Sequence, residues 1–382
     1  MILFIDQSGQ IGGAELCLAD LAEHRKDGRV VLFADGPFAQ VLRRRNVGVE
    51  ILALPGGASR ITKQASPAAL AATIPGLCAH VLALRRRCRE ADLLFFNTAK
   101  ALIHGTAANV LPRRPCIHHL HDLWDRRHFS GVNIRLLTAA ANRADTVIAN
   151  SRATADQFLR AGGRSRVEVI PNGFDPRPFD RAPAGAIREL RHSLSPSGRP
   201  VAAIFGRLSR WKGQDILLRA AWDLPDLEVW IVGEAMFTGD DHAYAGELRS
   251  LAADPALRDR VRFLGFRDDI PELMRAADIV VHGSVSPEPF GRVIAEAMLA
   301  RKPVVASAAG GPLEIVEDAV TGLLVPPGDP AACRAAIAQL TADPAAASAM
   351  GERGRVRAET HFALPVVLAQ TDAVINALLR DS

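Results

Sequence analysis

Short apolar runs recur along the whole chain and alternate with longer stretches that have helical spacing of apolar residues. Most of the runs are apolar throughout, as strands are when helices cover both faces of their sheet. The alternation therefore predicts an α/β protein built on doubly wound parallel sheets. The predicted strands are Ile2–Asp6, Val30–Ala34, Leu93–Phe96, Cys116–Leu120, Thr146–Ala149, Val167–Ile170, Val201–Phe205, Glu228–Val232, Val261–Leu264, Asp278–Val281, Val304–Ala306 and Leu323–Val325.

Length and proline content predict two domains. The chain has 382 residues, more than one ordinary domain holds. The segment Asp175–Pro200 contains five prolines and two glycines, which is typical of a linker. We therefore expect one domain over residues 1–180 and a second over residues 181–382. The alanine-rich end, Ala331–Ser382, is expected to be helical, and its last helix is expected to pack back on the first domain.

The composition argues against several classes of protein. No apolar run approaches the roughly 20 residues that a membrane-spanning helix needs. The first residues are apolar without a preceding basic segment, which favours a strand over a signal peptide. Five scattered cysteines without CxxC spacing favour reduced thiols in a cytoplasm over a disulfide framework or a zinc site. We expect no bound metal.

Charge is distributed unevenly between the two halves. Residues 1–180 contain 24 Lys and Arg against 16 Asp and Glu, a net charge of +8, whereas residues 181–382 have a net charge of −4. A basic first half suggests an anionic partner. Arginine clusters contribute to this charge, and the segment Leu77–Arg89 resembles a basic helix that lies on a surface. Solvated helix ends in an arginine-rich protein would give the same pattern. The clusters are Arg43–Arg45, Arg85–Arg87 with Arg89, and Arg113–Arg114.

One motif whose residues could bind a ligand or take part in a reaction follows the strand Asp278–Val281. Its sequence is SPEPFGRVIAEAM, residues 286–298. Gly291 would begin a helix, whose N-terminus offers free N–H groups to a phosphate or a sugar hydroxyl. Glu288 and Glu296 are eight positions apart, near two helical turns, so one can lie at the loop and the other on the same side of the helix. Spacing alone favours a loop glutamate and a surface helix glutamate without a role in binding.

A second motif, FGRLSRWKG at residues 205–213, follows the strand Val201–Phe205. Arg207 and Lys212 project from the strand-end loop before a predicted helix, Gln214–Trp222. A guanidinium fork and an ammonium together can clamp a pyrophosphate. Taken alone, a solvated basic turn would explain these two residues as well.

Together, these motifs resemble the donor-binding signatures of family four of the retaining glycosyltransferases, also called glycosyltransferase group 1. In that family, a GRL…KG strand end precedes an element of the form E-P-F-G…E-A. The resemblance covers nearly the whole chain. It implies the GT-B fold, in which two Rossmann-like doubly wound domains face each other across a cleft. Further matching segments are Gly12–Glu15, Asn150–Ser151 with Thr154, Ile170–Asp175, Ala309–Pro312 with Glu314, and Gly322–Val325.

The resemblance also implies roles for particular residues. Arg207 and Lys212 would bind the donor diphosphate and stabilise the charge on the leaving group. Glu296 would hold the ribose hydroxyls, and Glu288 would hold sugar hydroxyls as part of the catalytic set. Phe266 would border the nucleobase, although a core aromatic is an equal alternative. The remaining predicted donor contacts are Phe290, Gly291, Arg292 and Val293.

Two further sites in the first half follow from the resemblance. Gly12 and Gly13 would let the backbone approach a phosphate, where a plain tight turn is the alternative. His121, with Asp122 after it, matches a His-Asp pair near the transferred sugar and is predicted to be catalytic. His118 and His119 are expected to be packing or polar residues. Trp124 is expected to be a half-buried structural residue, and stacking on an acceptor is the alternative.

The resemblance implies a metal-independent enzyme without a cofactor, whose donor is a UDP-sugar or a GDP-sugar. Trp211 stands where related sequences often have Arg or Lys, and Arg292 where an apolar residue is common. Both departures leave the donor undecided. Two alternatives share the architecture: a sugar-nucleotide 2-epimerase, and a non-catalytic protein that binds sugar nucleotides.

The acceptor is expected to bind the first half, at the loops Pro55–Pro67 and Asp125–Asn133. A small molecule, a glycan or a lipid-linked acceptor would each suit the family. No recognition motif for nucleic acid accompanies the basic charge. Peripheral contact of the basic domain with the anionic inner membrane face is a further hypothesis.

Overall fold

The computed structural model describes residues 1–55, 67–127, 129–236 and 239–380, with side chains from residue 75 onward in the helix that begins at Pro67. These residues form two compact units. Unit 1 comprises Met1–Asn172 and Val367–Ser382, and unit 2 comprises Gly173–Val366. Of the two predicted acceptor loops, residues 56–66 and residue 128 lie outside the described residues. None of the described helices has the length and apolar content needed to cross a membrane.

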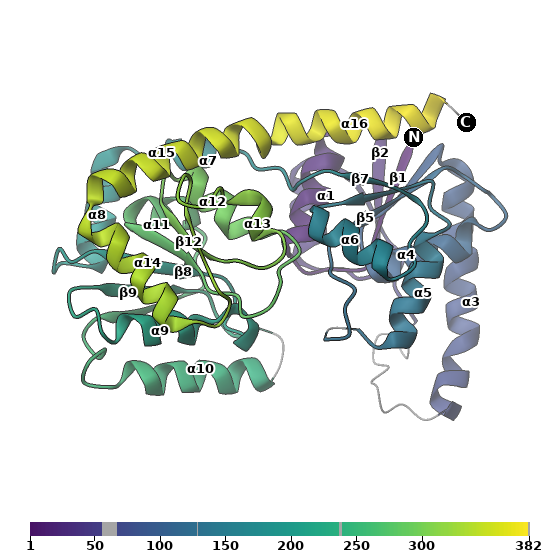
Figure 1. The fold of residues 1–382 in the computed structure, drawn as a ribbon. Helices are drawn as coiled ribbons and strands as arrows, with labels where there is room; N and C mark the ends of the chain where they lie inside the picture. Colours follow the sequence, from purple (N-terminus) through teal and green to yellow (C-terminus); the bar gives the residue numbers. More distant parts are fainter. Residues whose placement is uncertain (56–66, 128, 237–238, 381–382) are drawn as a thin grey trace. The chain divides into compact units, whose positions relative to one another are not determined.

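Unit 1 is built on a seven-stranded sheet in which all neighbouring strands run parallel (Figure 1). The strand order is β3-β2-β1-β4-β5-β6-β7. The strands are β1 (Ile2–Asp6), β2 (Gly28–Leu32), β3 (Gly48–Ile51), β4 (Leu93–Phe96), β5 (Cys116–Leu120), β6 (Thr146–Ala149) and β7 (Arg166–Val169). The helices between them are α1 (Gly13–His24), α2 (Pro37–Arg44), α3 (Pro67–Glu90), α4 (Ala99–Asn109), α5 (Gly131–Ala141) and α6 (Arg152–Arg160).

Unit 2 repeats this arrangement with a six-stranded parallel sheet in the order β10-β9-β8-β11-β12-β13. The strands are β8 (Val201–Phe205), β9 (Glu228–Val232), β10 (Val261–Gly265), β11 (Ile279–His282), β12 (Val304–Ser307) and β13 (Leu323–Val325). The helices are α7 (Arg177–Arg181), α8 (Ala184–Leu194), α9 (Gln214–Ala221), α10 (Gly239–Ala252), α11 (Ile270–Ala276), α12 (Arg292–Leu299), α13 (Pro312–Ile315), α14 (Pro330–Ala342), α15 (Pro344–His361) and the start of α16 (Leu364–Arg380).

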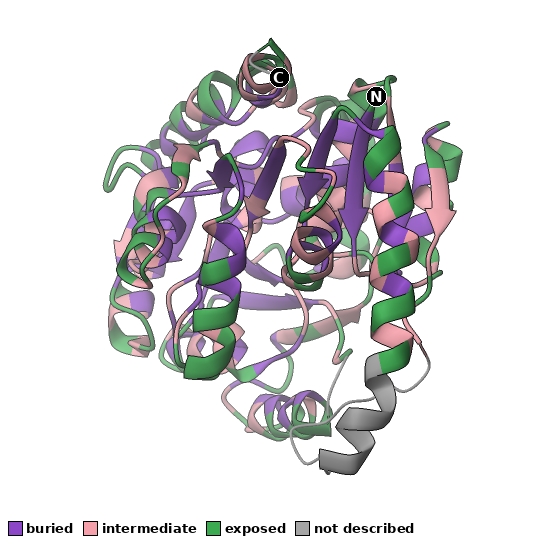
Figure 2. Ribbon diagram, turned by 90° about the vertical axis from the view of Figure 1, so that its right-hand side faces the viewer, coloured by how far each residue is buried: buried purple, intermediate pink, exposed green. Residues whose placement is uncertain are grey.

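Each sheet is buried on both faces, as the apolar runs predict. In β1, Ile2 and Phe4 belong to one hydrophobic cluster, whereas Leu3 belongs to the cluster on the opposite face. In β8, Phe205 belongs to one hydrophobic cluster, and Ile204 belongs to the cluster on the opposite face. Figure 2 shows the consequence: the strands of the sheets are largely buried, whereas the covering helices alternate between buried and exposed stretches. The predicted fold class, two Rossmann-like doubly wound domains, is confirmed.

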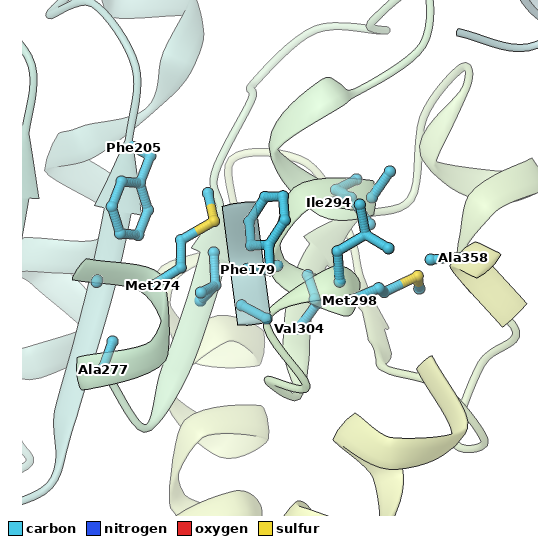
Figure 3. Packing of buried hydrophobic residues seen from close by; sticks show 14 of the residues in the cluster. Phe179, Phe205, Met274, Ala277, Ile294, Met298, Val304 and Ala358 are labelled. Carbon is cyan, nitrogen blue, oxygen red and sulfur yellow. The ribbon is translucent and has the colours of Figure 1, made fainter. Parts of the chain in front are cut away.

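The core on one side of the unit 2 sheet shows how the helices are fixed to it. Phe179 from α7, Met274 from α11 and Met298 from α12 meet Phe205 and Val304 of the sheet (Figure 3). All five side chains are buried. Because α12 begins next to the candidate site, this packing also fixes the position of its first turn.

Three local predictions were wrong. The second strand begins two residues earlier than predicted, at Gly28. The edge strand β3 was not predicted, because its sequence, GVEI, is only partly buried and lacks an apolar run. The predicted linker contains the helices α7 and α8. Pro176 and Pro183 stand immediately before these helices, where proline is tolerated.

The end of the chain belongs to unit 1. Val367 and Ile375 of α16 are buried in the same cluster as Ile2 and Phe4. Arg25 Nη1 donates to Asp372 Oδ1 over 3.0 Å. Residues 367–380 therefore pack on the N-terminal sheet.

Candidate donor and acceptor sites

The loops that contain the predicted donor-site residues follow neighbouring strands of unit 2. Arg207 and Lys212 come after β8, and Glu288 comes after β11. β8 and β11 are neighbours in the sheet. From β8 the next strands along the chain are added on one side, and from β11 they are added on the other. The carboxyl ends of strands at such a switch point are where α/β proteins bind ligands. The structure thus brings the three residues to one edge of the sheet, while their role in binding stays a prediction.

A glycine allows these two loops to approach closely. Gly213 has a φ of 65°, and a Cβ there would lie 2.0 Å from the carbonyl oxygen of Gly283. The backbone N–H of Val285 donates to the carbonyl of Trp211 over 2.9 Å. No residue with a side chain fits this position without displacing the backbone. The approach fixes the turn η2 (Arg210–Lys212), from which Lys212 projects.

Glu288 is buried and accepts hydrogen bonds from three side chains. Lys212 Nζ donates to Oε1 over 2.5 Å, and Ser284 Oγ donates to Oε2 over 2.8 Å. His282 Nε2 donates to the same Oε2, because an ionised carboxylate only accepts. The carboxylate is therefore tied to the loop after β8 and to the end of its own strand. Its predicted contact with sugar hydroxyls stays a prediction.

The charge state of Glu288 follows from these neighbours. Burial by itself raises the pKa of the carboxyl, but the charge of Lys212 and the charge and hydrogen bond of His282 outweigh burial. The pKa of Glu288 consequently lies well below its ordinary value. Glu288 is therefore ionised at neutral pH and balances the ammonium of Lys212.

Trp211 lies against both cations of the predicted phosphate clamp. Lys212 Nζ is 4.1 Å from the centre of the indole ring, and Arg207 Cζ is 5.8 Å from it. Cations at these distances over an aromatic face are attracted by its negative potential. Trp211 therefore keeps the ammonium and the guanidinium near each other, although it adds no charge of its own.

The helix α12 begins at the same edge of the sheet. Its N-cap, Gly291, has a φ of 107° and no side-chain cap on the first turn. The N–H groups of this turn are suited to an anion or a hydroxyl. The predicted helix start is one residue from the observed one.

The predicted donor residues Arg292, Val293 and Glu296 lie on this helix, and Phe290 lies just before its N-cap. Arg292 Cζ lies 4.4 Å from the ring centre of Phe174, and its Nη2 lies 3.4 Å from Glu296 Oε1. Phe290 is buried and stacks on Phe174, so its side chain is part of the core. Val293 is half-buried. Arg292, the departure from the family pattern, therefore restrains Glu296, the predicted ribose ligand.

Phe266 follows the edge strand β10 and is 63% exposed. Gly265 before it has a φ of 65°. A Cβ at Gly265 would lie 3.1 Å from Glu234 Oε1. The exposure of Phe266 argues against the alternative of a core aromatic. Its stacking on a nucleobase stays a prediction.

In unit 1, the glycine pair lies at the start of α1. Gly12 is the N-cap and Gly13 the first helical residue. A Cβ on Gly12 would lie 2.6 Å from Glu15 Oε2, so the carboxylate folds back over the turn. Burial raises the pKa of Glu15, although hydrogen bonds from its own N–H and that of Gly12 oppose the shift. The helix N-terminus thus already lies against the carboxyl group of Glu15.

His121 is half-buried and belongs to a hydrogen-bonded network at the carboxyl edge of the unit 1 sheet. Its Nε2 lies 3.0 Å from Asn97 Oδ1, and Asn97 Nδ2 donates to Asp6 Oδ2 over 2.6 Å. Burial, with the nearby charge of Glu15, raises the pKa of Asp6 to about 7. His121 follows β5, Asn97 follows β4 and Asp6 is the last residue of β1. The switch point of this sheet lies between β1 and β4.

The other two histidines of this strand pack in the interior. His118 stacks on Trp124, which is fully buried rather than half-buried. Burial lowers the pKa of His118 to about 4 and that of His119 to about 3, so both are neutral. Among the described residues, no group of three or more His, Cys, Asp or Glu side chains is arranged to hold a metal ion.

Four residues of these networks were missed by the sequence analysis: Asp6, Asn97, His282 and Ser284. Each lies at, or within three residues of, the carboxyl end of a predicted apolar strand. A polar side chain in that position was the available signal, because ligand sites of parallel sheets gather there.

Two family models match the chain. The model described as Glycosyl transferases group 1 matches residues 187–357, and the model described as Glycosyltransferase Family 4 matches residues 11–177. Among curated relatives, the lipopolysaccharide core biosynthesis mannosyltransferase LpcC of Rhizobium leguminosarum bv. viciae is 34% identical over 67% of this chain and 75% of its own length. The D-inositol 3-phosphate glycosyltransferase of Mycobacteroides abscessus is 39% identical over 48% of this chain and 42% of its own length. The chain thus spans less than half the length of the latter relative.

Solved structures match over the whole chain. Anabaena HepE in complex with UDP-glucose is 39% identical, with a TM-score of 0.87 over 98% of this chain and 99% of that chain. Sucrose-phosphate synthase of Thermosynechococcus elongatus has the same fold, with 24% identity and a TM-score of 0.84 over 100% of this chain and 99% of that chain. These matches define the class as GT-B proteins. The chain belongs to the group 1 glycosyltransferases of that class.

Proposed function

We propose that this protein is a retaining, family-four glycosyltransferase that moves a hexose from a nucleoside diphosphate sugar to a hydroxyl acceptor without a divalent metal. The observation that supports it most is the arrangement of Lys212. Its ammonium lies at the carboxyl edge of the sheet, between the indole of Trp211 and the ionised carboxylate of Glu288. The guanidinium of Arg207 also lies over the indole ring of Trp211.

In this proposal, negative charge grows on the diphosphate as the bond from the sugar to the phosphate oxygen breaks. Lys212, Arg207 and the first turn of α12 stabilise that charge. The leaving phosphate takes the proton of the acceptor hydroxyl as the new glycosidic bond forms on the same face of the sugar. His121 would contact the transferred sugar.

UDP-glucose is the donor to test first. HepE, similar to this chain over nearly its full length, has been solved with UDP and with UDP-glucose. A GDP-sugar is the second choice, because LpcC is named a mannosyltransferase. Neither donor requires a cofactor from the protein.

The acceptor class is suggested by relatives and by charge. One relative is named for D-inositol 3-phosphate and another for the lipopolysaccharide core. Residues 1–180 have a net charge of +8. An acceptor with a phosphate, either a small molecule or a lipid-linked glycan, would suit a basic unit 1.

Peripheral contact with an anionic membrane is part of the proposal. Leu82 on α3 and Val132 and Leu136 on α5 are more than half exposed, and α4 lies between these helices. Arg86 and Arg135 are exposed on the same two helices. Apolar side chains beside arginines are the composition of a surface that binds anionic lipid. Arg87 is a poorer candidate, because it pairs with Glu50.

A donor panel tests the proposal. UDP-, GDP- and ADP-sugars are compared by thermal shift, and the products of the best donor are identified by mass spectrometry with and without EDTA. A hexose added to an acceptor in EDTA supports the proposal. An epimerised sugar still bound to its nucleotide supports the epimerase, and binding without any product supports a binding protein. Activity that EDTA abolishes and magnesium restores would reject metal independence.

A further inference from the structure

Asn97 lies between the two predicted site segments of unit 1. It follows β4, whose neighbours in the sheet are β1 and β5. Its side chain is buried, with 1% exposure. The Gly12–Gly13 turn follows β1, and His121 follows β5. Asn97 is therefore placed to connect the glycine turn with the histidine.

Both amide hydrogens of Asn97 have acceptors. Nδ2 donates to Asp6 Oδ2 over 2.6 Å and to the carbonyl oxygen of Ala14 over 3.2 Å. A backbone carbonyl can only accept, so the contact with Ala14 fixes which way the amide faces, whatever the protonation state of Asp6. The orientation of Asn97 therefore follows from chemistry.

The amide orientation determines which nitrogen of His121 is protonated. With Nδ2 toward Asp6 and Ala14, the amide oxygen faces His121 Nε2 at 3.0 Å. An amide oxygen only accepts, so Nε2 must be the donor. In a neutral imidazole with its proton on Nε2, the lone pair is on Nδ1.

The neighbouring ring of His119 and the acidic groups of this edge do not by themselves make this choice. The ring centre of His119 lies 3.8 Å from that of His121, with 43° between the planes. Burial keeps His119 neutral. The acidic groups of this edge are Asp6, Glu15 and Asp122, and a negative charge attracts a proton to either nitrogen. The amide oxygen of Asn97, 3.0 Å from Nε2, does distinguish Nε2 from Nδ1, because it only accepts.

We propose that Asn97 is a positioning residue that holds His121 in the tautomer protonated on Nε2, so that the neutral ring can accept a hydrogen bond only at Nδ1. Through Ala14, the same amide ties the position of His121 to the turn at Gly12 and Gly13. The inference rests on the proposed function for the role of His121 in sugar transfer, but the tautomer itself does not depend on turnover.

The test is a long-range nitrogen–proton correlation spectrum of protein labelled with nitrogen-15 histidine, recorded where His121 is neutral. The signals of His121 are identified by their loss in His121→Gln. The expected result is a protonated Nε2 and an unprotonated Nδ1. A protonated Nδ1 would overturn the inference.

Two variants make the test specific to Asn97. Asn97→Ala should convert His121 into a mixture of tautomers. Asn97→Asp, of nearly equal size, should raise the pKa of His121, because a carboxylate beside Nε2 favours the imidazolium ion. Asn142→Asp is the matched control, since Asn142 bonds to Gly162 and Arg164 and should leave the His121 signals unchanged. An unchanged His121 tautomer and pKa in both Asn97 variants would contradict a positioning role.

The two proposals fail separately. If His121 has the expected tautomer but no donor yields a product, the proposed function fails and the assignment to Asn97 holds. If transfer is observed but Nδ1 is protonated, the assignment to Asn97 fails and the proposed function holds. Retention of the native melting temperature shows that each variant is folded.

Discussion

The ammonium of Lys212 lies 2.5 Å from the carboxylate of Glu288, and both side chains are less than one-fifth exposed. A pair buried to this extent is neutral as a unit, although each partner is charged. The pair therefore keeps a cation ready at the edge of the sheet without leaving an uncompensated charge there. A diphosphate that approaches Lys212 would compete with Glu288 for its hydrogen bonds.

Lys212→Ala should lower the rate of sugar transfer by roughly 10²–10³, as expected for loss of a donor aimed at developing charge. The same change leaves Glu288 buried without its cation and should lower the melting temperature. Adding Glu288→Gln removes that charge, so the double variant should regain stability but not activity. Steady-state kinetics and thermal melts measure both effects. A double variant with restored turnover would contradict the role of Lys212.

Glu296→Ala should weaken binding of UDP by about 1–3 kcal/mol, because hydrogen bonds to a charged group are lost. Calorimetric titration with UDP measures this directly. Glu352→Ala is the control, since Glu352 lies on α15 in an exposed pair with Arg301. Equal affinities of the wild-type protein and the Glu296 variant for UDP would show that Glu296 does not bind the donor.

The stability of the protein should depend on pH through Asp6. The pKa of Asp6 is raised from 3.8 to about 7, chiefly by burial. Between these values the native state holds a proton that the unfolded chain has released, so stability falls as pH rises through this window. The melting temperature of the wild type should therefore fall relative to Asp6→Asn between about pH 4 and about pH 8. Asp35→Asn removes an exposed carboxylate and is the control, and its curve of melting temperature against pH should run parallel to that of the wild type. An Asp6→Asn curve parallel to the wild type would contradict the raised pKa of Asp6.

Contact with anionic lipid should depend on the exposed arginines of α3. The protein should co-sediment with vesicles that contain anionic lipid, less at raised salt, and not with neutral vesicles. Arg86→Glu with Arg89→Glu should reduce binding strongly. Arg181→Glu with Arg188→Glu makes the same charge change on exposed residues of unit 2 and should reduce it less. Absence of vesicle binding at low salt, or an equal loss of binding in the two double variants, would contradict membrane contact through α3. A soluble acceptor would then be the better hypothesis.

Much of the fold could be predicted because its strands are buried on both faces. Runs such as Leu93–Phe96 are apolar for that reason. The pattern failed at Gly48–Ile51, an edge strand that is only partly buried. It also failed at α7 and α8, because prolines before a helix have the same sequence signature as prolines in a linker.

The candidate sites could be predicted only in part. Motif positions located Arg207, Lys212 and Glu288 at strand ends. The partners of Glu288 could not be found in this way, because the pairing of Glu288 with His282 depends on how a loop folds back over its own strand. The link from His121 to Asn97 likewise depends on the register of β4 and β5, which spacing along the chain does not reveal.

The measurement that tests the central claim most directly follows the sugar of UDP-glucose by nuclear magnetic resonance as the purified protein consumes it in EDTA. The account predicts that UDP is released and that the glucose appears first in the α configuration, whether it reaches an acceptor or water. It also predicts that Lys212→Ala slows this release. Glucose that appears first in the β configuration, a sugar that changes while still attached to UDP, or release that requires a divalent metal would contradict the account.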